Sequence, residues 1–406
     1  MDVILSSGKV GHYYNLALTL QEAGYLKKFI TTSYFKNLNN NSLINNCLIR
    51  ISNNRVYSRF NEKLNADKIR PIFYPEMIRR IIEMLTFRSN VLPTKIYNYL
   101  FDWASCKYLE ESDIFFVAIT YGLFSGLKAR EMGVNVVLDM ISAHPTYYIK
   151  TLKEEMNKYH VIGDLKDEYY LEKMVKEFEI ADFIIVPSQF VYKTMVTEGI
   201  PFSKIRIIPY GVNIDQFKVQ DKKDNVFRII FVGPLKLGKG IQYLLGAYKE
   251  LNLKNSELLL IGRDSPEVAN ILKEYFGYFI HIPVVPHKFI NDYYSNSSVF
   301  VLPSLVEGSA LVVYEAMACG IPVIVTENCG SVVRDGKDGF VIPIRDVEAL
   351  KEKLMFFYEN ESSRLEMGKS ARKQAEAYSW GKYQEELIRT LDEIVKLKET
   401  TFHANV

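Results

Sequence analysis

Short runs of apolar, β-branched residues alternate with amphipathic segments along nearly the whole chain. Runs of this kind, bounded by turn residues, predict buried strands, and the amphipathic segments between them predict helices. The predicted strands are Val3–Ser6, Phe29–Thr32, Ile114–Thr120, Val136–Met140, Phe183–Pro187, Ile205–Pro209, Arg228–Val232, Glu257–Ile261, Ile280–Val284, Val299–Leu302, Val323–Thr326 and Phe340–Ile342. Because these strands are apolar throughout and alternate with helices, they predict parallel sheets that are covered on both faces.

The amphipathic segments have the apolar spacing of helices that pack one face on a sheet. The predicted helices are Tyr13–Ala23, Tyr97–Glu110, Gly163–Glu179, Phe190–Glu198, Ile241–Leu251, Pro266–Phe276, Ala310–Ala318, Val347–Asn360 and a last long helix at about Trp380–Lys398. The alternation restarts after the polar segment Asp215–Asn225, which we predict to be a linker. The pattern therefore predicts an α/β protein with two doubly wound domains, residues 1–217 and 226–379, and a cleft that faces the carboxyl ends of both sheets.

The composition is that of a folded soluble protein, with 406 residues, 48% hydrophobic and 24% charged, and a net charge of +2 that indicates no nucleic-acid partner. Charge is less even between Arg50 and Lys95, where ten basic residues face four acidic ones. The basic residues are Arg50, Arg55, Arg59, Lys63, Lys68, Arg70, Arg79, Arg80, Arg88 and Lys95. Part of this stretch is amphipathic, so it is either an ordinary solvated helix face or a patch that touches an anionic membrane surface or acceptor.

The cysteines and the apolar runs indicate in which cellular compartment the protein is expected. Cys47, Cys106, Cys319 and Cys329 form neither a CxxC pair nor a cluster with zinc spacing, so we expect reduced thiols. The first predicted core strand begins at Val3, which leaves no room for a secretory signal, and no apolar run approaches the roughly 18–20 residues of a membrane span. We expect a cytoplasmic protein, with peripheral contact at the inner face of the membrane through residues 50–95.

The segment Pro303–Thr326 carries the most informative chemistry. A strand ends at Leu302, a loop rich in Pro, Ser and Gly follows, and a helix is predicted from near Ser309 to Gly320. The free amides of the helix start are a natural site for an anion such as a phosphate. Two carboxylates, Glu307 and Glu315, flank this site and would repel a bare phosphate, but they accept hydrogen bonds from sugar or ribose hydroxyls. A nucleotide sugar offers both groups.

Two other interpretations of these glutamates stay open at this point. Glu307 could cap the helix while Glu315 is a solvated helix residue. The pair could also be the acid and base of a glycosidase. The second interpretation is weaker, because both residues come from one loop–helix unit and have little reason to face opposite sides of a substrate.

A second candidate loop runs from Phe231 to Gly240. It leads from a strand through a glycine-rich turn into a helix, with Lys239 at the helix entrance. Glycines allow a close approach of the backbone, and a lysine beside a helix start suits a diphosphate. The plain alternative is a tight turn.

Together these features resemble a known family. The E-x7-E spacing, the Glu307-Gly308 pair and the run from Glu315 through Cys319-Gly320-Ile321-Pro322 resemble the signature of retaining glycosyltransferases of family 4, also called group 1, which have the GT-B fold. The resemblance implies that Glu315 holds the ribose hydroxyls of a nucleotide. It also implies that the donor sugar is contacted by Glu307 and the positions after it, namely Gly308, Ser309, Ala310 and Leu311. Ala310 stands where the family often has glycine, and we expect little effect because that position can act through its amide.

The Phe231–Gly240 loop resembles the family's G-R-L-x-x-x-K-G loop. Gly233 and Lys239 match the pattern, but Pro234 replaces the arginine that binds the donor diphosphate, so Lys236 or a first-domain residue would have to compensate. Gly262-Arg263 and Val285-Pro286-His287 fall where family members approach the nucleotide base, although Arg263 could equally be a surface arginine.

The first half resembles the family more loosely. Gly8-Lys9-Val10-Gly11-His12 matches the acceptor-side glycine loop, which places Gly11 at the donor, and the alternative is an ordinary turn. His144 follows a strand where the family has a histidine near the donor sugar, and the alternative is a structural histidine. Residues 380–406, beginning at Trp380, match the family's terminal helix that crosses back onto the first domain.

The resemblance implies transfer of a sugar, with retention, from a UDP- or GDP-sugar to a hydroxyl acceptor in cell-envelope polysaccharide or glycolipid synthesis. His144, Lys239 and Glu307 are the expected catalytic residues, and no metal is expected because no Asp-x-Asp motif follows a strand near these loops. Two alternatives remain: a GT-B sugar-nucleotide epimerase, and a non-catalytic nucleotide-sugar-binding protein, to which Pro234 lends some weight. Domain closure about the linker and the Trp380 helix is expected to complete the site.

Overall fold

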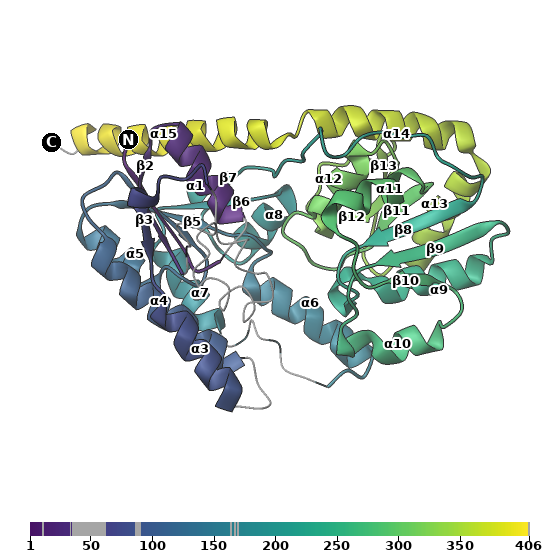
Figure 1. Ribbon diagram of the computed structural model, residues 1–406, viewed down its shortest axis with the longest axis horizontal. Coiled ribbons are helices and arrows are strands. Elements are labelled where there is room, and N and C mark those ends of the chain that lie inside the picture. The colour runs from purple at the N-terminus through teal and green to yellow at the C-terminus, as the bar shows by residue number, and fades with distance from the viewer. Residues whose placement is uncertain are drawn as a thin grey trace, which may run out of the picture.

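Two Rossmann-like α/β domains lie side by side, and a long C-terminal helix runs back along the first of them (Figure 1). The computed structural model describes residues 1–9, 12–32, 34, 62–85, 91–162, 165, 168 and 170–404. The predicted fold class, two doubly wound parallel-sheet domains with a returning terminal helix, is confirmed.

The first domain is built on a seven-stranded parallel sheet with the order β3-β2-β1-β4-β5-β6-β7. Its strands are β1 (Val3–Ser7), β2 (Leu26–Thr31), β3 (Ile69–Pro71), β4 (Ile114–Ala118), β5 (Asn135–Asp139), β6 (Phe183–Val186) and β7 (Ile205–Ile207). Its helices are α1 (His12–Glu22), α3 (Tyr74–Leu85), α4 (Val91–Ser105), α5 (Leu123–Glu131), α6 (Pro145–Lys158), α7 (Leu171–Ile180) and α8 (Gln189–Thr197). The strand order reverses between β1 and β4, so their carboxyl ends open a crevice.

The second domain repeats this plan with a six-stranded parallel sheet in the order β10-β9-β8-β11-β12-β13. Its strands are β8 (Phe227–Val232), β9 (Ser256–Ile261), β10 (Ile280–Ile282), β11 (Val299–Leu302), β12 (Val323–Thr326) and β13 (Gly339–Ile342). Its helices are α9 (Ile241–Leu251), α10 (Ala269–Glu274), α11 (Ile290–Ser295), α12 (Leu311–Ala318), α13 (Val347–Glu359) and α14 (Glu361–Glu376). Here the order reverses between β8 and β11, and the two loops singled out in the sequence follow these two strands.

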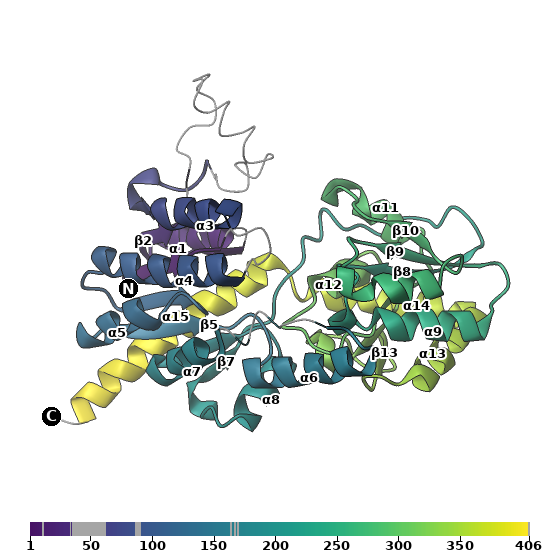
Figure 2. The same cartoon turned by 90° about the horizontal axis from the view of Figure 1, so that it is seen from below.

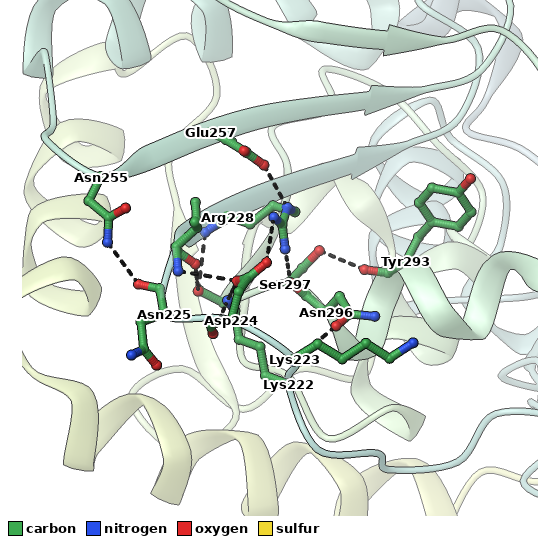
Figure 3. A network of polar contacts seen from close by, with 12 residues as sticks. Lys222, Lys223, Asp224, Asn225, Arg228, Asn255, Glu257, Tyr293, Asn296 and Ser297 are labelled. Atoms are coloured by element: carbon green, nitrogen blue, oxygen red, sulfur yellow. Dashed lines mark hydrogen bonds and ion pairs between the residues drawn. The ribbon is translucent and has the colours of Figure 1, made fainter.

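The predicted linker Asp215–Asn225 is fixed to the second domain. Asp224 accepts a hydrogen bond from Arg228 at 3.0 Å, and the backbone N–H of Lys223 donates to Asn296 Oδ1 at 3.1 Å (Figure 3). Phe217, just upstream of these contacts, is buried in the second core. This segment is therefore part of the second domain, and the expectation that it serves as a hinge finds no support in these contacts.

The two chain crossings between the domains lie just before this segment and just after α14. The N–H of Val212 donates to the carbonyl of Tyr378 at 2.9 Å, so the outgoing and the returning segments run next to each other. A Cβ on Gly211 would fall inside the backbone of Ser379, so this close pairing requires glycine. The chain therefore passes between the domains at this pair of adjacent segments.

Helix α15 (Trp380–Ala404) returns to the first domain. It crosses the face of that domain in both views (Figures 1 and 2). Its apolar positions are buried in the first core, at Tyr383, Leu387, Leu391 and Ile394. The returning helix thus ties the end of the second domain to the first one.

Helix α6 forms an additional bridge between the domains (Figure 2). It begins in the first domain, but Met156 and the following Tyr159 pack against the second core. Near its end, Glu155 is fully buried and accepts hydrogen bonds from Tyr243 Oη and, at 2.9 Å, from Arg345 Nε. A paired buried carboxylate of this kind fixes the helix against the second domain.

Candidate functional site

The loops that follow β8 and β11 are pressed together at the switch point of the second sheet. The N–H of Leu305 donates to the carbonyl of Gly238 at 2.9 Å. Gly240 has a φ of 70°, and a Cβ there would lie 2.8 Å from the carbonyl carbon of Pro303. Glycine is thus required for the helix entrance of one loop to approach the backbone of the other.

This contact brings Lys239 and Glu307, from separate loops, into an ion pair. Ser304 Oγ donates to the same carboxylate at 3.1 Å. The side chains of Lys239 and Glu307 are 23% and 14% exposed, so an ammonium and a carboxylate stand together with limited access to solvent. The first can bind a phosphate oxygen and the second a hydroxyl group.

The helix after the Glu307 loop begins at Leu311, two residues later than predicted. The reason is tertiary: the amide of Ala310 donates to the carbonyl of Cys329 at 3.0 Å, so it is not free to bind a ligand as we expected. Ser309 also has a partner, since its Oγ lies 3.0 Å from Tyr314 Oη. The amides of Leu311 and Val312 are in the first turn, which an α-helix leaves without intrahelical partners.

Glu315 lies in the second turn of α12 and is held in place by two side chains. Its side chain is only 14% exposed, Tyr294 Oη donates to its Oε2 at 3.0 Å, and His287 Nε2 lies 3.2 Å from its Oε1. Burial and the neighbouring carboxylate raise the pKa of Tyr294 well above its ordinary value, and the hydrogen bond to Glu315 raises the pKa of His287. The alternative of a solvated helix glutamate is therefore wrong.

The first domain faces this loop directly at Gly308. A Cβ on Gly308 would lie 2.7 Å from the carbonyl carbon of Ile141 and 3.2 Å from Ser142 Cα. Ser188 Oγ, at the start of α8, donates to the carbonyl of Gly308 at 2.6 Å. The two domains are therefore in backbone contact beside the paired loops.

His144 is buried, with 4% of its surface exposed. Its Nδ1 accepts the N–H of Thr146 and so caps α6, and its ring packs against Phe178 at 5.2 Å between centroids. Burial lowers its pKa to about 4, so the imidazole is neutral at pH 7. The structure shows a capping role, and the predicted contact with a donor sugar stays a prediction.

The remaining predicted donor residues lie around the ends of β8 and β9. Gly233 donates to the carbonyl of Ile261 at 2.8 Å, and a Cβ on Gly262 would lie 2.6 Å from the carbonyl carbon of Gly233. Arg263, which follows, is exposed, as are Pro234 and Lys236.

The corresponding loop of the first domain is only partly described, and Gly11 lies outside the described residues. Gly8 is packed so closely that a Cβ would lie 2.8 Å from the ring of Tyr121, and Tyr97 Oη donates to its carbonyl at 2.8 Å. The neighbouring loop after β4 is held by Glu177, which accepts the amides of Thr120 and Gly122 and whose pKa is raised to about 7 by burial. These buried supports carry no motif, so the sequence did not reveal them.

The stretch predicted to carry a basic patch looks different in the structure. Four of its arginines, Arg50, Arg55, Arg59 and Arg88, lie outside the described residues. On α3, Arg79 pairs with Glu76 and Glu83, and Arg80 pairs with Glu76. The residues that α3 exposes are apolar: Tyr74, Met77, Ile81 and Met84. Over the described part, α3 therefore presents an apolar stripe with internally paired charges.

The described residues lack both a metal-binding cluster and a helix that could span a membrane. There, no group of three or more His, Cys, Asp or Glu side chains is arranged to hold a metal ion. Over the same ranges, no helix combines the length and the apolar character that crossing a bilayer requires. Cys106, Cys319 and Cys329 are free thiols, and Cys47 lies outside the described residues.

Two Rossmann-like domains with parallel sheets, joined by a terminal helix that returns to the first domain, define the GT-B fold. In the second of them, residues 212–374 match the family model described as glycosyl transferases group 1. The second domain is therefore similar to the group 1 glycosyltransferases over these residues.

The capsular polysaccharide biosynthesis glycosyltransferase CapM of Staphylococcus aureus is 30% identical over 230 residues, which are 51% of this chain and 60% of that protein. The chain thus spans less than two thirds of this relative. Among solved structures, HepE of Anabaena in complex with UDP and glucose has a TM-score of 0.63 at 13% identity, over 97% of this chain and 100% of that one. A trehalose-6-phosphate synthase, studied for glycosyl transfer with retention, has a TM-score of 0.65 at 12% identity, over 97% and 99% of the two chains. At these identities the structural likeness shows the fold.

Proposed function

We propose that the protein transfers a sugar from a nucleotide sugar to a hydroxyl acceptor. The observation that carries the proposal is the arrangement around Glu315: a mostly buried carboxylate, held by Tyr294 and His287, at the switch point where Lys239 and Glu307 meet. Buried carboxylates need partners, and those of Glu315 leave lone pairs that can accept further hydroxyl donors. The ribose of a nucleotide supplies two such donors.

In this proposal, each part of the nucleotide sugar has a partner in the protein. Glu315 accepts the ribose hydroxyls, and Lys239 together with the amides of Leu311 and Val312 binds the diphosphate. Glu307, which shares the ion pair with Lys239, accepts hydroxyls of the donor sugar. Metal independence stays part of the proposal, because no Asp-x-Asp motif follows a strand near these loops.

We further propose retention at the anomeric carbon. The bond between that carbon and the diphosphate oxygen breaks as the acceptor oxygen forms its bond on the same face, and the acceptor proton passes to the departing phosphate oxygen. Lys239 and the helix amides stabilise the charge that develops on this oxygen. Support comes from the resemblance to the retaining family and from the trehalose-6-phosphate synthase with the same fold.

For the acceptor we propose a glycan or glycolipid of the cell envelope, as the name of the capsular relative suggests. The exposed stripe of α3, with Met77, Ile81 and Met84, would lie in the surface of the membrane that carries such an acceptor. This apolar stripe stands beside the predicted basic patch as support for the proposed peripheral membrane contact.

The test is a donor panel of UDP-, GDP- and ADP-sugars, with hydrolysis and product stereochemistry followed by NMR. We expect slow hydrolysis of one donor with retention. Lys239→Ala should lower this turnover by about 10²-fold or more, the usual loss when a charge-stabilising donor is removed. Glu315→Gln should weaken donor binding by about 10-fold or more, because it removes a charged acceptor. Glu366→Gln, at an exposed glutamate of α14, is the control and should change neither value.

Other outcomes separate the alternatives. Formation of a 2-epimer would indicate an epimerase, and tight binding of a nucleotide sugar without turnover would indicate a binding protein. Full turnover in Lys239→Ala would show that the proposed phosphate site is misplaced.

A further inference from the structure

His287 contacts Glu315, a contact that no sequence pattern predicts. It opens the short turn before α11, after the strand β10, and its Nε2 lies 3.2 Å from Glu315 Oε1. Tyr294, one turn along α11, donates to the other oxygen at 3.0 Å. His287 and Tyr294 therefore each hold one of the two oxygens of the Glu315 carboxylate.

The other ring nitrogen of His287 is also engaged. Gln216 Nε2 lies 2.7 Å from His287 Nδ1 and 3.3 Å from the carbonyl of the same residue. An amide NH₂ only donates, so Nδ1 of the neutral ring is the acceptor and Nε2 carries the proton. In this tautomer the Nε2–H points to Glu315, as a hydrogen-bond donor should.

This held ring is exposed to solvent. The His287 side chain is 65% exposed, with one edge against Phe217 at 5.5 Å between ring centroids. A surface side chain of this kind contributes little to the stability of the fold. Its fixed orientation therefore needs an explanation other than packing.

The orientation makes sense if Glu315 binds a vicinal diol. A carboxylate has about four acceptor positions, and His287 and Tyr294 take one on each oxygen. One further position on each oxygen remains for a ligand, and the two are held in one plane before the ligand arrives. Fixing a flexible glutamate in advance lowers the ordering cost of binding.

We infer that His287 is a positioning residue that holds Glu315 ready for both hydroxyls of a ribose, and so helps the site to select ribonucleotides over 2′-deoxyribonucleotides. The inference rests on the proposed function, because it takes Glu315 as the ribose ligand. Tyr294 alone would fix one oxygen and leave the carboxylate free to rotate about its terminal bond.

The experiment is calorimetric titration with UDP, GDP and ADP, followed by the 2′-deoxy form of whichever binds most tightly. The proteins are wild type, His287→Ala, His287→Gln and Lys288→Ala. Lys288→Ala is the matched control, since it changes the adjacent exposed side chain, whose ammonium lies over the ring of Phe289 at 4.7 Å. Thermal unfolding of each variant shows whether the fold is intact.

We expect His287→Ala to weaken the ribonucleotide by about 3- to 10-fold, the effect of one hydrogen bond, and the deoxy form by less than about 2-fold. Selectivity for ribose therefore falls. His287→Gln should restore most of it, because a glutamine amide can donate to Glu315, and Lys288→Ala should leave the ratio unchanged.

Equal losses for both ligands in His287→Ala, no loss for either, or no recovery in His287→Gln would each overturn the inference while the proposed function stands. If wild type binds none of the three nucleotides, the proposed function fails, and the inference fails with it.

Discussion

Adding a single methyl group at Gly308 should lower turnover of the donor and leave nucleotide affinity nearly unchanged. Its backbone lies against Ile141 and Ser142 of the first domain, and its carbonyl accepts the hydroxyl of Ser188. Its φ is not in the left-handed region, so Gly308→Ala leaves the loop free to keep its conformation within the second domain. The new Cβ instead meets the first domain.

The size of the effect follows from the distances. The Cβ would lie 2.7 Å from the carbonyl carbon of Ile141 and closer still to its oxygen, whereas carbon atoms approach to about 3.5 Å, so the domains must separate locally by at least about 1 Å. The carbonyl concerned is backbone and has no rotamer to change. A misplacement of about 1 Å between reacting groups can cost about 10²-fold in rate. We therefore expect turnover of the donor to fall by about that factor.

The assay compares donor hydrolysis with nucleotide affinity in the same variant. Nucleotide affinity should change by less than about 3-fold, since the groups proposed to bind the nucleotide all belong to the second domain. Gly246→Ala is the control, because it is the same substitution in the same domain, where the nearest atom to the new Cβ is Tyr275 Oη at an ordinary 3.6 Å. Small-angle X-ray scattering reports whether the domains have moved apart.

Wild-type turnover in Gly308→Ala would refute the argument that this backbone contact belongs to the working conformation. An equal loss in Gly246→Ala would refute its specificity.

Three further predictions concern stability. Gly246→Ala itself should raise the free energy of unfolding by about 0.5–1 kcal/mol, because it replaces glycine inside α9 without a clash; denaturant titration checks this. Glu155→Gln should lower the free energy of unfolding by about 1–2 kcal/mol, since a fully buried carboxylate loses its charge opposite the partly exposed Arg345. Glu154, a half-exposed partner of the same arginine, is the control, and Glu154→Gln should change the free energy of unfolding by no more than about 0.5 kcal/mol. A pKa of about 7 for Glu177 lies above its unfolded value, so this group contributes stability below about pH 4.5 that is lost as the pH rises through 7. Glu177→Gln should therefore be less stable than wild type at pH 5. The difference in the free energy of unfolding should narrow by about 3 kcal/mol or less toward pH 8. A constant difference across this range would contradict the raised pKa of Glu177.

Most strands could be predicted because they are apolar on both faces and bounded by turn residues. The short edge strand β3 was missed, since Ile69–Pro71 ends in a proline and has only one neighbouring strand, β2. Helix α6 was missed for a different reason. Its apolar residues serve two cores, with Tyr148 in the first and Met156 in the second, so they do not form one stripe of helical period.

The candidate site also combines residues with a local sequence signal and contacts that depend on the tertiary structure. Glu307, Glu315 and Lys239 could be proposed from the sequence because their signals are local: a fixed spacing of the two glutamates in one loop and helix, and a glycine-rich loop that ends at Lys239. The contacts of Glu315 with His287 and Tyr294 span 28 and 21 residues and follow from the order of the strands, which no spacing records. The bond from Ala310 to Cys329 is also tertiary, and it moved the helix start beyond the predicted residue. For His287, the sequence indicated only a position after a strand, and it did not indicate Glu315 as the partner.

The most direct test of the central claim is a crystal structure with the nucleoside diphosphate that binds most tightly. We predict that the ribose hydroxyls lie within hydrogen-bonding distance of Glu315 and that a phosphate oxygen contacts Lys239, both at the carboxyl ends of β8 and β11. A nucleotide bound elsewhere, or bound here with its ribose turned away from Glu315, would contradict the proposed site.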